Sequence, residues 1–157
     1  MNVEIYCDGS CFVKKRLGAW AAYIYIENKL IKKNDVVRDT TNQAMELTAV
    51  LSTLRYLEEK NIHPAQIFVF TDSQYVCRLP ERRKVLEEKK FSNRRGEKLP
   101  NWQLVKKLYT YLDKHEIEFH KIAAHLPPGT SPESDRLRAV DKMARQLVRK
   151  AVRNEQT

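Results

Sequence analysis

Apolar residues occupy every second position from Val3 to Cys7, and this alternation predicts a β-strand at the start of the chain. Asp8 follows the alternation, and Gly9 and Ser10 after it predict a turn. A carboxylate beside a core strand is costly unless a partner compensates its charge. We therefore expect Asp8 to have partners, and the candidates are other acids together with a metal ion.

Two further strands are predicted before the first helix. Residues 18–26 are almost continuously apolar or aromatic, which is typical of a buried strand, and the turn Asn28-Lys29 leads into a more polar strand at 30–37. The polar character of this third strand favours a position at the edge of the sheet. The connection between the first two strands, residues 12–17, carries three basic residues.

A helix that begins with a capping box is predicted next. Thr40 is the expected N-cap, with Gln43 three residues later, and apolar residues then recur at helical spacing from 47 to 57. Glu46 lies beside this apolar stripe. A compact strand at 66–70 ends just before Asp72, so the two strands and the helix between them predict a parallel βαβ unit. Taken alone, Glu46 is equally explained by the helix dipole, and Asp72 by an N-cap.

The second half of the chain predicts further helices and a fifth strand. Residues 78–107 predict two or three helices, the last of which opens at Leu99-Pro100-Asn101. A strand is predicted at 117–122, followed by a Pro- and Gly-containing loop at 123–132. A final helix is predicted from Ser134 to Val152, with Asp141 at the edge of its apolar stripe. That stripe consists of Leu137, Val140, Ala144, Leu147 and Ala151.

Length and composition predict one soluble domain over residues 1–157. Hydrophobic residues make up 42% of the chain and charged residues 31%, and no apolar run is long enough to cross a membrane. The three cysteines have no metal-ligand spacing, which favours a reduced, intracellular and hence cytoplasmic protein. The formal net charge of +9 favours a polyanionic partner, with nucleic acid first.

Most of this positive charge lies in one segment, residues 78–107. It holds eleven basic residues against four acidic ones, with Phe91 and Trp102 interleaved, as is typical of surfaces that bind nucleic acid. A run of charges taken alone more often forms a solvated helical face.

Four acids stand at strand ends or on the inner edges of helices: Asp8, Glu46, Asp72 and Asp141. If they converge, they repel one another unless cations fill the site. Oxygen ligands of this kind favour Mg²⁺ or Mn²⁺ over Zn²⁺, and two such ions support in-line phosphoryl displacement. In a basic protein, this chemistry indicates phosphodiester hydrolysis.

Four sequence blocks that contain these acids resemble the type 1 ribonuclease H family, in the family's order and over essentially the whole chain. The blocks are Tyr6-Cys7-Asp8-Gly9-Ser10-Cys11, Thr41-Asn42-Gln43-Ala44-Met45-Glu46-Leu47, Thr71-Asp72-Ser73-Gln74-Tyr75-Val76 and Val140-Asp141-Lys142-Met143-Ala144-Arg145. The resemblance implies a ribonuclease H-like α/β fold with a five-stranded mixed sheet flanked by helices. It also implies an endonuclease that cuts the RNA strand of RNA–DNA hybrids and leaves 5′-phosphate and 3′-hydroxyl ends.

The resemblance further implies roles for individual residues. Asp8, Glu46, Asp72 and Asp141 would hold two Mg²⁺ ions, with Mn²⁺ able to substitute, and His125 would assist proton movement or product release. The basic segment would be a protrusion that grips the hybrid. The implied substrate-binding residues are Ser10 and Cys11 near the RNA strand, Asn42, Gln43 and Gln74 in the minor groove, Thr41 and Asn101 at a DNA phosphate, and Arg94, Arg95, Lys98 and Trp102 in the protrusion.

The chain departs from the family pattern in two connections. Ala123-Ala124 precedes His125 where many members have a glycine, and residues 12–17 replace a glycine-rich connection. Two alternatives to the nuclease stay open, namely a hybrid- or duplex-binding relative with impaired catalysis and another polynucleotidyl transferase of the superfamily. We expect a free-standing monomer.

Overall fold

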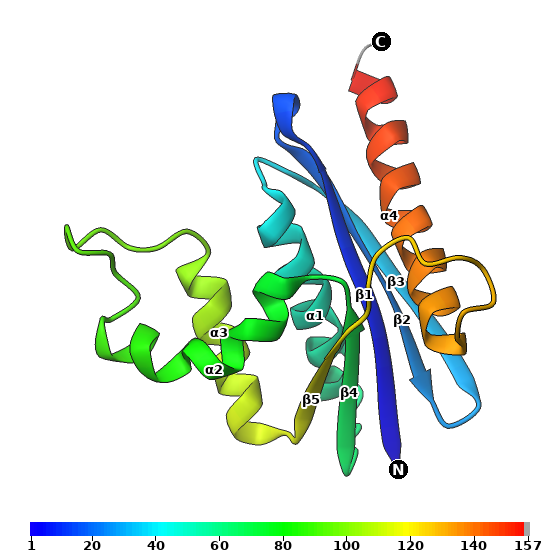
Figure 1. The fold of residues 1–157 in the computed structure, drawn as a ribbon, viewed down its shortest axis with the longest axis horizontal. Helices are drawn as coiled ribbons and strands as arrows, with labels where there is room; N and C mark the ends of the chain where they lie inside the picture. The colour runs from blue at the N-terminus through cyan, green and yellow to red at the C-terminus, as the bar shows by residue number, and fades with distance from the viewer. Residues whose placement is uncertain (156–157) are drawn as a thin grey trace.

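Five strands form one mixed sheet in the computed structural model, which describes residues 1–155 (Figure 1). The strands are β1 (Asn2–Phe12), β2 (Leu17–Ile26), β3 (Lys29–Arg38), β4 (Gln66–Thr71) and β5 (Ile117–Lys121). Their order is β3-β2-β1-β4-β5, with β2 antiparallel to both its neighbours and β4 parallel to both of its own. The predicted fold class, the edge position of the third strand and the parallel βαβ unit are confirmed.

Helices cover both faces of the sheet. One face packs against α1 (Asn42–Glu59), which is followed outward by α2 (Gln74–Glu88) and α3 (Trp102–Lys114), and the other face packs against α4 (Pro132–Glu155) (Figure 1). The alternation in β1 divides its side chains between two cores. Val3, Ile5 and Cys7 lie in the core beneath α1, whereas Tyr6 lies in the smaller core beneath α4. No helix within residues 1–155 combines the length and the apolar character needed to span a bilayer.

The first strand is longer than predicted. Gly9 and Ser10 do not form a turn, because β1 continues to Phe12 and stays paired with β2 as far as Leu17. The turn of the next hairpin falls at Glu27 and Asn28, one residue earlier than predicted, with Glu27 in the left-handed conformation at a φ of 55°. Backbone pairing along the whole length of the hairpins extends the strands beyond what their apolar pattern indicates.

The first helix is capped by Thr41 rather than by the predicted Thr40. The Ala44 amide donates to Thr41 Oγ1 at 3.1 Å, and the Thr41 backbone is extended, as an N-cap requires. Thr40 is buried, and its own amide donates to the Arg16 carbonyl at 3.0 Å. The β1–β2 connection thus holds Thr40 and moves the start of the helix one residue along.

The basic segment forms two helices and a loop. Residues 89–101 join α2 to α3, and together they protrude beside the sheet (Figure 1). The last helix begins at Pro132 and ends at Glu155, so it is longer than predicted at both ends. Its buried stripe ends at Val148, whereas Leu147 and Ala151 are only half-buried. The buried residues of α4 therefore lie more nearly on one face of the helix than the predicted residues do.

Candidate active site

Asp8 lies on β1 where helix α1 comes closest to the sheet. The next residue, Gly9, allows this approach, because a Cβ atom on it would lie 2.5 Å from both the Glu46 nitrogen and the Met45 carbonyl carbon. A missing side chain on β1 thus lets the backbone of α1 rest on the strand. As a consequence, the Glu46 backbone lies against Gly9, the residue that follows Asp8 on β1.

Ser73 fixes the second acid. Its hydroxyl accepts from the Val76 amide at 3.1 Å as the N-cap of α2, and it donates to Glu46 Oε2 at 2.7 Å. Ser73 is buried, so this hydrogen bond lies within the protein and not at the surface. It links the start of α2 to the first turns of α1 and orients the Glu46 carboxylate.

Asp72 and Asp141 complete the cluster around Asp8. Asp72 immediately follows β4, the parallel neighbour of β1, and Asp141 reaches the same place from α4. The Asp8 carboxyl lies against those of both Asp72 and Asp141. On its outer side, Asp141 accepts from Arg145 at 2.9 Å, one helical turn further along. The structure therefore brings together all four acids that the sequence singles out.

Three carboxyl groups of this acid cluster resist ionisation. Burial, then the neighbouring Asp141 carboxyl and the charge of Asp72, together raise the pKa of Asp8 to about 9. Burial, followed by the charge of Asp141, also raises the pKa of Asp72. Burial raises the pKa of Glu46, although the hydrogen bond from Ser73 opposes the shift. Carboxylates that repel one another in a buried place are stabilised by a cation.

The donor set fits a hard divalent cation. All four groups offer carboxylate oxygen, which Mg²⁺ and Mn²⁺ prefer, and Mg²⁺ keeps several waters instead of using a complete protein cage. Within residues 1–155, however, no group of three or more His, Cys, Asp or Glu side chains is arranged so that it could hold a metal ion. It is therefore the chemistry of the donor groups, and not their arrangement, that fits a cation.

His125 lies at the rim of the acid cluster. It lines a small hollow together with Asp72 and Asp141, and its charge lowers the pKa of Asp72, although burial outweighs this effect. The His125 backbone is left-handed, with a φ of 59°. The residue preceding it, Ala124, takes part in the same turn, so this turn aims the histidine at the acids without a glycine.

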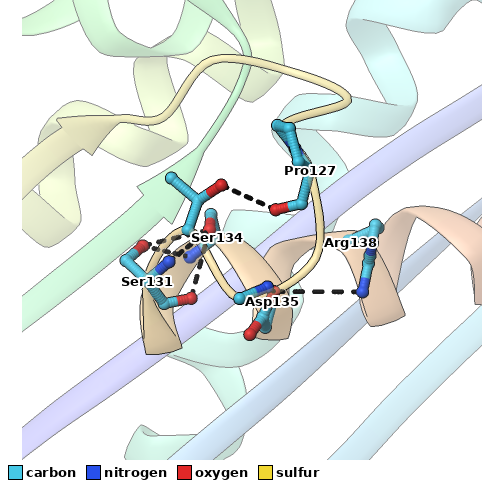
Figure 2. Close-up of polar contacts among 7 residues, drawn as sticks. Pro127, Ser131, Ser134, Asp135 and Arg138 are labelled. Atoms are coloured by element: carbon cyan, nitrogen blue, oxygen red, sulfur yellow. Dashed lines mark hydrogen bonds and ion pairs between the residues drawn. The ribbon is translucent and has the colours of Figure 1, made fainter.

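Hydrogen bonds fasten the loop after His125 onto the start of α4 (Figure 2). The Gly129 amide donates to Asp135 Oδ1 at 2.9 Å, and the Thr130 hydroxyl donates to the Pro127 carbonyl at 2.6 Å. The Ser134 amide donates to Ser131 Oγ at 3.0 Å, and the Ser131 amide donates to Ser134 Oγ at 3.1 Å. This reciprocal capping makes the proline-containing loop a fixed strap beside the acid cluster.

Known proteins with similar sequences identify the family to which this chain belongs. The family model described as RNase H matches residues 1–149. The chain belongs to the RNase H family. A ribonuclease H of Nitratidesulfovibrio vulgaris is 31% identical over 137 residues, which cover 86% of this chain and 83% of the relative. Family membership makes the chain a ribonuclease H, a hydrolase of RNA–DNA hybrids in a family that uses divalent metal ions.

Two solved structures share the fold. One is LC9-RNase H1, a type 1 RNase H with the type 2 active-site motif, with a TM-score of 0.74, 17% identity and coverage of 94% of this chain and 72% of that one. The other is the foamy viral protease-reverse transcriptase in complex with an RNA/DNA hybrid, with a TM-score of 0.71 and 19% identity. It covers 92% of this chain, which spans 19% of the viral chain. At these identities, the likeness shows the fold alone.

The predicted minor-groove residues Asn42, Gln43 and Gln74 lie at the starts of two helices of this RNase H, as does Thr41, a predicted phosphate contact. Thr41, Asn42 and Gln43 are exposed at the N-terminus of α1, and Gln74 is exposed as the first residue of α2. Ser73 links these two helix starts through Glu46, and we refer to the four exposed side chains as the helix-start surface. The Cys11 thiol, on β1, donates to the Thr40 carbonyl at 3.6 Å and so joins this surface as well.

A cavity of about 240 Å³ separates this surface from the protrusion. Gln43 and Trp102 line it, together with Tyr75 and Arg82. Asn101 lies next to it, caps α3 in a left-handed conformation without using its side chain, and hydrogen-bonds Tyr75. The predicted phosphate contact Asn101 and the predicted protrusion residue Trp102 therefore lie on the same side as the minor-groove residues.

The three predicted basic residues of the protrusion have different surroundings. Lys98 donates to the Lys90 carbonyl at 2.7 Å and lies 4.7 Å from the centre of the Trp102 ring, so it also holds the loop together. Arg94 lines a separate hollow, and Arg95 is exposed in the turn that Asn93 closes. The protrusion loop projects away from the sheet (Figure 1), so these arginines lie apart from the acids.

Sequence reasoning missed three residues that shape the site. Ser73 and Arg145 orient acids, and Gly9 sets the distance between strand and helix. For Ser73 and Arg145 a signal was present, since each lies next to an acid, directly or one helical turn away. For Gly9, its place in a pattern of alternating strand residues was the available indication.

Proposed function

We propose that this chain is an endonuclease that cuts the RNA strand of RNA–DNA hybrids with two divalent metal ions, Mg²⁺ or in its place Mn²⁺. Asp8, Glu46, Asp72 and Asp141 would hold the ions. The observation that carries the proposal is the convergence of four half-buried or buried carboxyl groups, of which Asp8, Glu46 and Asp72 have pKa values raised by burial and by neighbouring acids. Such a group of acids is suited to cations.

The metal ions would supply an activated water and would stabilise the charge on the attacking and leaving oxygens of an in-line displacement. Within the protein, Asp8 is the central ligand because it contacts both Asp72 and Asp141. Ser73 holds the Glu46 carboxylate in one orientation, and Arg145 does the same for Asp141. Cleavage of the bond between the phosphorus and the 3′-oxygen would leave a 5′-phosphate and a 3′-hydroxyl.

His125 would move a proton or help the cleaved strand to leave. It faces the acid cluster from the strap that α4 fastens, and it lines the same hollow as Asp72 and Asp141. An imidazole can both accept and donate a proton. Its fixed backbone keeps it near the reacting phosphate while leaving the side chain free to turn.

The hybrid would be recognised by shape. A-form duplexes present 2′-hydroxyls in a wide, shallow minor groove, and exposed amide side chains at the starts of α1 and α2 are suited to reach such a groove. Thr41 and Asn101 would hold a DNA phosphate, and the protrusion would follow the duplex. Contacts of this kind carry little sequence information, so cleavage at many sequences is expected.

A panel of labelled duplexes tests the proposal. RNA–DNA hybrid, double-stranded RNA and double-stranded DNA are incubated with the protein in Mg²⁺, in Mn²⁺ and in chelator, and the ends of the products are identified. We expect metal-dependent loss of the RNA strand of the hybrid alone, with 5′-phosphate products. Binding of the hybrid without cleavage would instead identify a binding protein, and cleavage of double-stranded DNA would identify another polynucleotidyl transferase.

A further inference from the structure

The connection between β1 and β2 is a short, positively charged turn at the same end of the sheet as the start of α1 (Figure 1). Val13–Lys15 form one turn of 3₁₀ helix, and Arg16 then closes it in the left-handed conformation with a φ of 50°. Val13 is 71% exposed at its apex. The turn continues the strand that carries Asp8, Ser10 and Cys11, so its position is fixed relative to the acids.

Hydrogen bonds make this turn a rigid part of the surface and tie it to the first helix. The Arg16 amide donates to the Val13 carbonyl at 3.2 Å, and the Thr40 amide donates to the Arg16 carbonyl at 3.0 Å. The Arg16 side chain pairs with Asp39 at 3.4 Å. The turn is thus joined to the residue before Thr41, the N-cap of α1. It is continuous with the surface that Thr41 and its neighbours form.

Two lysines of the turn have no role inside the molecule. Lys14 and Lys15 are exposed, and among residues 1–155 neither has a hydrogen bond or an ion pair. The nearby acid, Asp39, is already paired with Arg16. Two unpaired cations on a fixed turn, beside a surface proposed to bind a polyanion, are placed for phosphate contacts.

We propose that Lys14 and Lys15 bind backbone phosphates of the hybrid on one side of the cleaved bond. This inference rests on the proposed function and adds a contact region outside the acid cluster, the helix starts and the protrusion. Four residues of extended strand separate Asp8 from Phe12, which is about 13 Å. At about 3.4 Å of axis for each nucleotide, the lysines would reach phosphates about four nucleotides from the cleaved bond.

The hybrid is favoured over a protein partner as the occupant of this turn for two reasons. The turn is continuous with the helix start that carries Thr41, Asn42 and Gln43. Its charge is of one sign, which matches a nucleic-acid backbone.

The test compares two double variants that each remove two positive charges. K14A/K15A changes the turn, and K29A/K60A changes two exposed lysines at the opposite end of the sheet and of α1. Lys60 lies about 21 Å along the helix axis from Glu46, at 1.5 Å for each residue. Affinity for an uncleaved hybrid is measured in chelator between 50 and 200 mM salt, and steady-state cleavage is measured in Mg²⁺.

We expect K14A/K15A to bind more weakly and with a shallower salt dependence. Loss of two phosphate contacts reduces the slope of log affinity against log salt by about 1.8, so the defect shrinks about tenfold between 50 and 200 mM salt. The KM should rise while kcat stays close to that of the parent. The length dependence is measured on hybrids that are cleaved at a fixed site and shortened from one end. When fewer than about four base pairs remain beyond the cleaved bond, the parent and K14A/K15A should bind with equal affinity.

Failure of this inference and failure of the proposed function are distinguishable. If the parent cuts the hybrid and K14A/K15A matches K29A/K60A in affinity and salt slope, the lysines do not contact the substrate. An equal defect with hybrids of every length would also overturn the inference. A parent that neither binds nor cuts the hybrid would instead overturn the proposed function itself. Far-ultraviolet circular dichroism of both variants checks that the exposed changes leave the fold intact.

Discussion

Replacing Gly9 with alanine should reduce cleavage much more than it reduces folding. A Cβ atom on residue 9 would lie 2.5 Å from the Glu46 nitrogen and the Met45 carbonyl carbon, whereas ordinary contact begins at 3.4 Å. Both contacted atoms belong to the backbone of α1. Because the helix cannot turn a backbone atom aside, it must move away from β1 by about 0.9 Å, the difference between these distances.

Both consequences of this movement can be estimated. Overpacking of this kind costs about 1–3 kcal/mol, and the Tm of a chain this size falls by about 3 °C for each kcal/mol. A misplacement of about 1 Å in a catalytic group costs about a hundredfold in rate. We therefore expect Gly9→Ala to remain folded at 25 °C and to lose about a hundredfold in kcat on the hybrid, measured at saturating Mg²⁺.

Gly18→Ala is the matched control. A Cβ atom on Gly18 would meet Thr40 Cγ2 at 2.6 Å and Met45 Cγ at 2.8 Å, which are side-chain and not backbone atoms, and the Ser10 carbonyl oxygen at 3.0 Å. We expect this variant to keep most of its activity. Equal losses of kcat in the two variants, or full activity of Gly9→Ala, would refute the claim that Gly9 sets the position of Glu46.

Four further predictions follow from the site. Ser73→Ala should lower kcat about tenfold and stability by about 1 kcal/mol, whereas Ser73→Thr should restore both in cleavage assays and thermal melts. His125→Ala should lower kcat by about a hundredfold with KM unchanged; an unaltered kcat contradicts its role. Since folding raises the pKa of Asp8 to about 9, the metal-free protein binds an extra proton when folded, so its stability should fall between about pH 4 and 9. Asp8→Asn should flatten that fall in thermal melts and abolish stabilisation by Mg²⁺. Arg94→Ala with Arg95→Ala should weaken hybrid binding and lower its salt slope, and an unchanged slope counts against the protrusion.

The sequence carries the information on the sheet and on the acids because both depend on regular patterns. Alternation in β1 and the apolar run in β2 reflect which faces are buried, and the parallel pairing of β1 and β4 follows from a helix between two strands. Asp8 and Asp72 were found because each stands where an apolar strand pattern stops. Glu46 and Asp141 were found because each lies beside an apolar helical stripe.

The remaining features depend on contacts between residues far apart in the chain. Thr40 carries a good capping pattern, yet the Arg16 carbonyl holds its amide and Thr41 caps the helix instead. Gly9 has the appearance of a turn residue, but pairing with β2 keeps it in the strand. The choice of Val148 over Leu147 in the last helix depends on how α4 lies across the sheet. None of these contacts leaves a periodic trace in the sequence.

Strand-specific cleavage by the parent and by Asp72→Asn tests the central claim most directly. Both proteins are incubated with a hybrid labelled on each strand, in Mg²⁺ and in chelator, and hybrid binding is measured alongside. We expect the parent to cut only the RNA strand and only with metal, while Asp72→Asn binds the hybrid as the parent does but cuts it at least a hundredfold more slowly. Equal cleavage by the two proteins, or cleavage by the parent in chelator, would contradict the account of a metal-binding carboxylate site.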